Sequence, residues 1–333
     1  MSKPSRATAA DVALAAGVSK WTVTRAFTPG ASIAEHSRER VLQEAAKLGY
    51  RPNLLARSLT TKTTNLVAIL VDDFANSYKL PVLEVLTQAL QAEQMAAVLI
   101  NINQHFDHLS AILDADQRQV DAVILVGTDF KDEALKLSTL PASRPPLYVL
   151  ARESTIAHIP AVSCDARVSM AAINQHLWAQ GYRRPGFMSG PRSLSTALGR
   201  KNHFMAFWQQ QAGTTVPELA AGSYDHRAAA QALRAYLQQT PAAERIDVLM
   251  CENDALAIGV IETARHEFGL RVPQDLAIVG YDGDELAATP SFNLTSYRQP
   301  LQEMVATLIA MLKGRSEARS INLPGELIIR GST

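Results

Sequence analysis

The chain has 333 residues, of which 47% are hydrophobic and 19% charged, with a formal net charge of zero. This length allows about two or three globular units, and the apolar fraction excludes disorder, collagen-like repeats and low complexity. No apolar run reaches the ~18 residues of a membrane span, and residues 1–10 lack the apolar segment of a secretory signal. The sequence therefore predicts a soluble cytoplasmic protein, in which Cys164 and Cys251 are buried thiols rather than a disulfide or zinc ligands.

The charge is unevenly distributed along the chain. Residues 1–62 contain ten basic and four acidic side chains, a net charge of +6, which leaves −6 for residues 63–333. A basic head on an acidic body indicates a polyanionic partner for the head alone.

Residues 8–49 are expected to form three short helices. Thr8 and Asp11 are spaced as a capping box before the first helix, and Ser19 can cap the second. Gly17 lies where a tight turn between them needs a positive φ. The third helix is expected over about residues 34–48 and stops at Gly49.

The apolar spacing of this segment predicts a helix-turn-helix. Val12 and Ala13 face inward from the first helix, and Val18, Val23 and Ala26 face back from the second. The outward face of the second helix then carries side chains that can donate to base edges and phosphates. These are Lys20, Trp21, Thr22, Thr24 and Arg25. The alternative is a generic helical hairpin with a solvated charged face.

A polar linker with one short helical turn follows, and from residue 65 the pattern changes. Short apolar strands alternate with amphipathic helices, which predicts parallel sheets covered on both faces. A length of roughly 270 residues is long for one such unit, so two similar lobes are expected. The helices are expected at about 79–93, 108–118, 169–180, 200–212, 227–238, 254–268 and 300–313.

Several motifs together resemble the lactose-repressor (LacI/GalR) family of bacterial transcriptional regulators. In the head they are DVA at 11–13, AGVS at 16–19, TVTR at 22–25, LGYRPN at 48–53 and ARSL at 56–59. In the body they include DFANSY at 73–78, Arg200 with HF at 203–204, END at 252–254, VGYD at 279–282 and QP at 299–300. The resemblance implies a helix-turn-helix head joined to a two-lobed α/β body like that of periplasmic sugar-binding proteins.

The resemblance also implies a domain order. The head would span 1–52, a hinge helix and linker 53–62, and the effector-binding and dimerisation domain 63–333. Within that domain, lobe 1 would take about 63–164 and 297–323, and lobe 2 about 165–296 and 324–333.

By match to the family, Lys20, Trp21 and Arg25 would read bases in the major groove. Phosphate contacts would map onto Thr8, Ser19, Thr22 and Asn53. The family's serine cap of the third helix is Ala34 here, which removes about 1 kcal/mol of capping.

The hinge would contribute Ala56, Arg57 and Leu59, with Leu59 as an apolar wedge between base pairs of the minor groove. A helix of about two turns is unstable alone, so it would form only when two copies pair. The alternative is a plain linker with Leu59 tucked onto the body.

Polar residues that follow strand ends are candidates for an effector pocket, because open α/β sheets place their crevices there. They are Asp73, Tyr78, Arg152, Asp165, Arg200, Tyr224, Asn253 and Asp282. Each could instead cap a helix or join the lobes. Ala151 replaces an aspartate found in some sugar-responding members, which mildly favours an anionic effector. The expected effector is a sugar, a sugar acid or a sugar phosphate.

The sequence carries no nucleophile elbow, P-loop or dinucleotide fingerprint, so neither an enzyme nor a cofactor is expected. His105 and His108 are interpreted as part of a solvated loop rather than a metal site.

The helix near 79–90 is apolar on more than one face, which favours a homodimer. The function expected is a repressor of carbohydrate-use genes that binds near-palindromic operator DNA; the rivals are a sugar transport protein and an architectural DNA binder.

Overall fold

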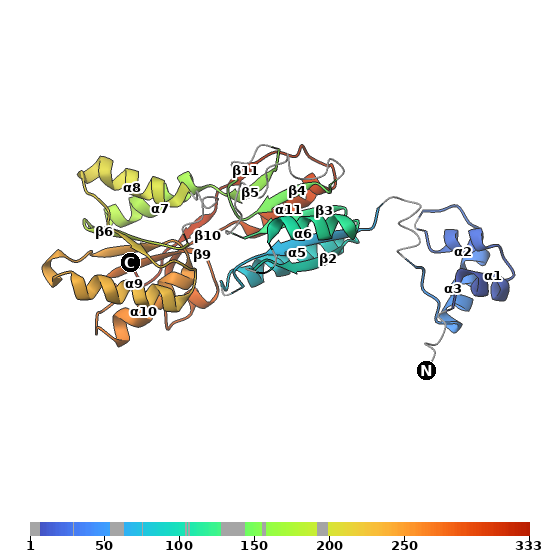
Figure 1. The fold of residues 1–333 in the computed structure, drawn as a ribbon, viewed down its shortest axis with the longest axis horizontal. Coiled ribbons are helices and arrows are strands. Elements are labelled where there is room, and N and C mark those ends of the chain that lie inside the picture. Colours follow the sequence, from blue (N-terminus) through green and yellow to red (C-terminus); the bar gives the residue numbers. More distant parts are fainter. Residues whose placement is uncertain are drawn as a thin grey trace. The chain divides into compact units, whose positions relative to one another are not determined.

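The computed structural model describes residues 7–28, 30–53, 63–74, 76–103, 105, 107–127, 144–154, 158–191 and 199–333. The chain divides into two compact units, Met1–Thr64 and Asn65–Thr333 (Figure 1). No helix among the described residues is long and apolar enough to cross a membrane.

The first unit consists of three helices around a small core. They are α1 (Ala9–Ala16), α2 (Lys20–Ala26) and α3 (Glu35–Lys47). The core comes from the inward faces predicted above, with Val12, Val23 and Val41 fully buried at its centre. The helix-turn-helix prediction is confirmed.

The ends of these helices follow their sequence signals. Thr8 and Asp11 form the capping box of α1, and Ser19 accepts a hydrogen bond from the Thr22 amide at the start of α2. Gly17 adopts φ +62° between them, the left-handed conformation that glycine favours. Ala34 at the start of α3 makes no side-chain capping bond, as its lack of a hydroxyl predicts.

The second unit contains two six-stranded sheets. The first has the order β11-β5-β4-β3-β1-β2, and all of its strand pairs are parallel. Its strands are β1 (Leu66–Val71), β2 (Ala96–Asn101), β3 (Ala122–Val126), β4 (Leu147–Leu150), β5 (Ala161–Cys164) and β11 (Ile321–Leu323). Helices α5 (Lys79–Ala92) and α11 (Leu301–Leu312) pack on one face, and α6 (His108–Gln117) packs on the other.

The second sheet has the order β12-β10-β9-β8-β6-β7, and only β10 and β12 pair antiparallel. Its strands are β6 (Pro185–Ser189), β7 (Glu218–Ala220), β8 (Val248–Cys251), β9 (Ala277–Asp282), β10 (Thr295–Arg298) and β12 (Glu326–Ile328). Helices α7 (Ala166–Ala179) and α8 (Gly199–Ala212) cover one face, while α9 (His226–Gln239) and α10 (Asp254–His266) cover the other (Figure 1).

The predicted α/β body with parallel sheets is confirmed, and each helix expected from residue 65 onward is present. Helix α7 begins three residues earlier than expected because Asp165 caps it, accepting a hydrogen bond from the Val168 amide at 2.9 Å. The chain passes from one sheet to the other at three places, after β5, after β10 and after β11. The residue limits given above for the domains and lobes stay predictions.

Candidate functional site

The outward face of α2 is a candidate nucleic-acid interface. Lys20, Trp21 and Thr24 are exposed there, and Trp21 has 66% of its surface open to solvent. The Arg25 guanidinium lies 4.3 Å from the centre of the Trp21 ring. This stacking orders two long side chains on one face. The guanidinium can still donate two hydrogen bonds to a pair of neighbouring acceptors.

The hydroxyl groups assigned to phosphate contacts already have partners within the head. The Thr8 hydroxyl donates to the Asp11 carboxylate at 2.8 Å, and the Ser19 and Thr22 hydroxyls lie 3.0 Å apart. The Thr24 hydroxyl donates to the Lys20 carbonyl at 3.1 Å. A hydroxyl oxygen can still accept or donate a further bond, so these contacts hold the helix starts in place without excluding a phosphate.

Sequence reasoning missed one positioning residue of the head. The two terminal nitrogens of Arg38 donate to the Ala26 carbonyl at 2.8 Å and the Ala31 carbonyl at 2.9 Å. Arg38, which belongs to α3, therefore connects α3 to the C-terminal end of α2. Its position in the sequence did not indicate this role.

Asn53 is exposed beyond α3. Ala56, Arg57 and Leu59, together with the rest of the expected hinge helix, lie outside the described residues. The DNA-contacting roles assigned to the head and hinge stay predictions.

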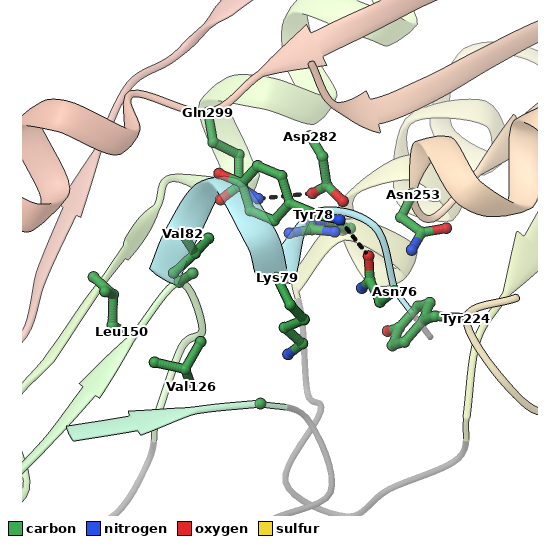
Figure 2. A pocket seen from close by; sticks show the side chains of 13 residues that line it. Asn76, Tyr78, Lys79, Val82, Val126, Leu150, Tyr224, Asn253, Asp282 and Gln299 are labelled. Atoms are coloured by element: carbon green, nitrogen blue, oxygen red, sulfur yellow. Dashed lines mark hydrogen bonds between the residues drawn. The ribbon is translucent and has the colours of Figure 1, made fainter. Parts of the chain in front are cut away.

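A pocket in the second unit lies where strands of both sheets end and helices begin (Figure 2). Its lining consists of Asn76, Tyr78, Lys79, Val82, Val126, Gly127, Leu150, Ala151, Arg200, Tyr224, Asn253, Asp282 and Gln299. The cavity measures about 40 Å³. Since one buried water needs roughly 10–15 Å³, this space holds only a few waters, and a larger ligand requires the walls to move apart.

Five of the eight predicted pocket residues line this cavity, namely Tyr78, Arg200, Tyr224, Asn253 and Asp282. The other three lie outside the lining. Asp165 serves as the cap of α7, the buried Arg152 donates through Nε to the Glu153 carbonyl at 3.2 Å, and Asp73 is half-buried with φ +49°. Their assignment to the effector stays a prediction.

The pocket also contains residues that sequence reasoning did not select. The polar ones are Asn76, Lys79 and Gln299, and Val82, Val126 and Leu150 form an apolar wall (Figure 2). Asn76 lies within the DFANSY motif and Gln299 within the QP motif. The family resemblance of these motifs could therefore have identified both residues as pocket candidates. Lys79 opens an amphipathic helix and resembled an ordinary surface lysine.

Arg200 is the most constrained of the lining residues. Its guanidinium lies 3.6 Å from the centre of the Tyr281 ring, and Nη1 donates to the Glu252 carbonyl at 2.8 Å. The side chain is buried, so an unpaired charge would cost several kcal/mol; the nearby Asp282 and Glu252 carboxyl groups stabilise it.

Asp282 carries a strained backbone and an unusual acidity. Its φ is +117°, and its Oδ1 accepts a hydrogen bond from Gln299 Nε2 at 2.8 Å (Figure 2). Burial raises the pKa of Asp282 to about 7, although Arg200 and the Gln299 bond oppose the shift. Burial likewise raises the pKa of Asp73 to about 6. Such strain and perturbed acidity are concentrated at functional sites.

Four buried polar atoms of the lining make no hydrogen bond with the part of the chain that the structure describes. They are the hydroxyls of Tyr78 and Tyr224, Asn253 Nδ2 and Gln299 Oε1. Unpaired buried polar atoms cost about 1–3 kcal/mol each, so they favour a ligand or ordered water as the missing partner.

Comparison with known proteins matches both units. The model of "Bacterial regulatory proteins, lacI family" matches residues 8–53, and that of "Periplasmic binding protein-like domain" matches residues 174–333. Catabolite control protein A of Priestia megaterium is 26% identical over 97% of this chain and 98% of its own length. The HTH-type transcriptional repressor PurR of Proteus mirabilis is 27% identical over 98% and 96%.

Solved structures agree on the fold. The lac repressor dimer bound to operator and an anti-inducer superposes with a TM-score of 0.85 at 21% identity, covering 99% of each chain. A cellobiose complex of the transcriptional regulator CelR superposes with a TM-score of 0.69 at 24% identity, over 98% of this chain and 100% of the other.

Proposed function

Because the chain belongs to the lacI family of bacterial regulatory proteins, we propose that it represses carbohydrate-use genes under the control of a small sugar-type effector. Operator DNA would bind the α2 face, and the effector would bind the pocket of the body. One observation carries this proposal: a helix-turn-helix whose second helix presents Lys20, Trp21 and Arg25 on one face, and a pocket with unpaired polar atoms, occur on one chain.

DNA binding is supported by the charge and geometry of the head. The +6 net charge of residues 1–62 provides a sequence-independent attraction to phosphates. Arg25 can form the bidentate contact to guanine that is the commonest specific contact in the major groove. A dimer would place two heads on the half-sites of a near-palindrome. This work would take place in the cytoplasm, where bacterial operators lie.

Effector control is supported by the position of the pocket at the strand ends of both sheets. A ligand that binds one arrangement of the lobes more tightly shifts the population toward it. If only one arrangement lets the segment 53–62 of two copies pair as hinge helices, effector binding changes the affinity for the operator. Several relatives are named repressors, so we propose no catalytic activity.

The experiment begins by selecting an operator from random duplex DNA with the full chain. Arg25→Ala should weaken binding to the selected duplex by roughly ten- to a hundredfold, the worth of one bidentate contact of 1–3 kcal/mol. Arg319→Ala removes an exposed arginine from the body and should change little. Equal affinity for selected and scrambled duplexes would instead identify an architectural DNA binder.

Effector control is tested on the same full chain by thermal unfolding with sugars and their derivatives. A ligand at about 100 times its Kd should add roughly 2.7 kcal/mol of stability. Each compound that stabilises the protein is then added to the operator complex. A compound that binds without changing operator affinity would favour a transport-type role for the body.

A further inference from the structure

Lys79 is an unusual residue to find inside this pocket. It is the first residue of α5, only 6% of its surface is exposed, and its side chain extends into the cavity (Figure 2). Lysine is almost never fully buried without a close partner, because the ammonium loses its hydration.

The partner that Lys79 has is a distant one. Its Nζ lies 3.6 Å from Asp72 Oδ1, which is an ion-pair contact but too long for a hydrogen bond. An ammonium has three donors to place, so within the described part of the chain this contact leaves it incompletely satisfied. Asp72 itself lies outside the lining, packed against Gly127, where a methyl group would come within 2.1 Å of its carboxylate. A ligand in the cavity would therefore meet the ammonium rather than the carboxylate.

The backbone around the pocket adds positive potential. Helix α5 starts at Lys79, the described part of α8 starts at Gly199 beside Arg200, and Asn253 caps α10. Each helix N-terminus carries roughly half a positive charge, and an acidic residue in the first turn normally offsets it. The first turns of α5 and α8 carry a cation at the cavity and no acid.

The charges that face Lys79 must be counted together. Asp72, Asp73 and Asp282 all act on it. Of these only Asp282 lines the cavity, where the charges of Arg200 and Lys79 both act on it and Gln299 donates a hydrogen bond to it. The lining itself therefore has two cations against one carboxylate.

We propose that the effector carries an acid group, a carboxylate or a phosphate monoester, and that Lys79 is the residue that selects it. Tyr78 and Asn253 add unpaired donors on the same cavity, which suit the oxygens of an acid. The wall of Val82, Val126 and Leu150 suits a carbon skeleton, and Ala151 adds no acid to repel the ligand. This inference rests on the proposed function, since it names the class of effector for the same pocket.

The experiment titrates the full chain with compounds that share a carbon skeleton and differ in charge. Glucose, glucuronate and glucose 6-phosphate form one series, and the galactose and mannose counterparts form two more. In at least one series, an acid should bind at least tenfold more tightly than its neutral sugar. The stronger of the two acids then distinguishes a carboxylate from a phosphate.

Lys79→Met should reduce binding of that acid at least tenfold more than it reduces binding of the neutral sugar. Since this change removes the cation beside the Asp72 carboxylate, the double variant Lys79→Met, Asp72→Asn is measured beside it. Lys313→Met removes an exposed lysine and should have no effect. Lys79→Arg keeps the charge and should retain the preference for the acid.

Neutral sugars that bind as well as the acids would overturn the inference, as would an acid preference that survives in both Lys79 variants. It also fails if no acid in the three series binds at millimolar concentration. The proposed function is judged separately. A neutral sugar that binds and changes operator affinity would support the proposed function and contradict only the proposal that the effector carries an acid group.

Discussion

At the scale of single residues, the acidity of Asp282 connects pH to the stability of the body. Burial raises its pKa from 3.8 to about 7, with Arg200, Gln299 and Lys79 opposing and Asp284 reinforcing the shift. Between roughly pH 4 and 7 the folded chain holds a proton that the unfolded chain has released. This group therefore adds stability as pH falls through 7, and that stability is lost as pH rises.

Asp282→Asn should remove this contribution. The dependence of the unfolding free energy on pH should lose a slope of at most about 1.4 kcal/mol per unit between pH 5 and 7, the worth of one proton. Urea unfolding at pH 5, 6, 7 and 8 measures it. Asp275→Asn is the control, because its exposed carboxyl has a pKa of about 2 and does not titrate in this range. An unchanged slope in Asp282→Asn would show that Asp282 ionises normally.

The missing cap of α3 makes a gain of stability possible. Ala34 already has the extended φ and ψ of an N-cap residue, −63° and 133°, but has no side-chain acceptor. Ala34→Ser should stabilise α3 by about 1 kcal/mol and slow amide exchange along it about fivefold. Ala34→Val adds bulk without an acceptor and should give no such protection. Equal exchange in the serine variant and the parent chain would contradict the prediction.

These residues also show what the sequence can and cannot predict about a site. Asn253 and Asp282 were predictable because they lie at strand ends, and parallel strands bring those ends to one crevice. Arg200 lies within α8 and was predicted from the family resemblance. Asp165 follows a strand too, yet its carboxylate caps a helix, and sequence position does not distinguish the two roles. Lys79 was missed because whether the first residue of a helix points to solvent or into a cavity depends on the opposite lobe.

At the scale of elements, the contact between α9 and α10 depends on one glycine. A Cβ at Gly259 would lie 2.3 Å from the His226 carbonyl oxygen and 2.7 Å from the His226 Cα. Backbone cannot move aside as a flexible side chain does. Gly259 therefore lets the N-terminal end of α9 approach α10 closely.

Gly259→Ala tests whether packing outweighs helix propensity. Alanine favours a helix by about 1 kcal/mol over glycine, so propensity alone predicts stabilisation. We expect destabilisation by about 1–3 kcal/mol instead, because the added methyl group overpacks the contact. The urea midpoint, followed by fluorescence of the buried Trp208, measures it. Glu262→Ala, exposed on the same helix, should change stability by less than about 0.5 kcal/mol. A stabilised Gly259→Ala would show that the helices separate freely.

The elements were predictable where hydrophobic periodicity is long, as in α5 and α9. Strands β7, β10 and β11 have three or four residues and lack a continuous apolar run, so their sequences do not mark them as strands. A segment that short has too few side chains to show a period of two, and its extended form depends on the strand that it pairs with. Thr295 and Ser296 of β10 are buried polar residues, which further hides the strand.

At the scale of the whole molecule, two exposed leucines lie on the side of the first sheet that α5 covers. Leu80 at the start of α5 is 69% exposed, and Leu99 of the edge strand β2 is 52% exposed. Leu99 is in register with Ile69, whose side chain belongs to the core under α5, so both leucines lie on the α5 side of the sheet. Exposed large apolar side chains at a helix start and a sheet edge favour an interface, and a second copy of the chain would bury them.

Leu80→Glu should weaken the homodimer, raising its dissociation constant by at least about tenfold, because burying one leucine is worth about 1.5–3 kcal/mol. Analytical ultracentrifugation without DNA measures the constant. Leu14→Glu, at an exposed leucine of the head, should leave it unchanged. If both variants dimerise like the parent chain, the interface lies elsewhere.

The order of strands along the chain determines when each unit can finish folding during synthesis. The head is complete within the first 64 residues, whereas β11 and β12, one edge strand for each sheet of the body, are the last strands to emerge. Because synthesis adds roughly 5–20 residues per second, the folded head is present for tens of seconds before either sheet of the body is complete. Until then the cell holds a DNA-binding head without the part that senses the effector. A message cut short before β11 would yield that unregulated head as a permanent product.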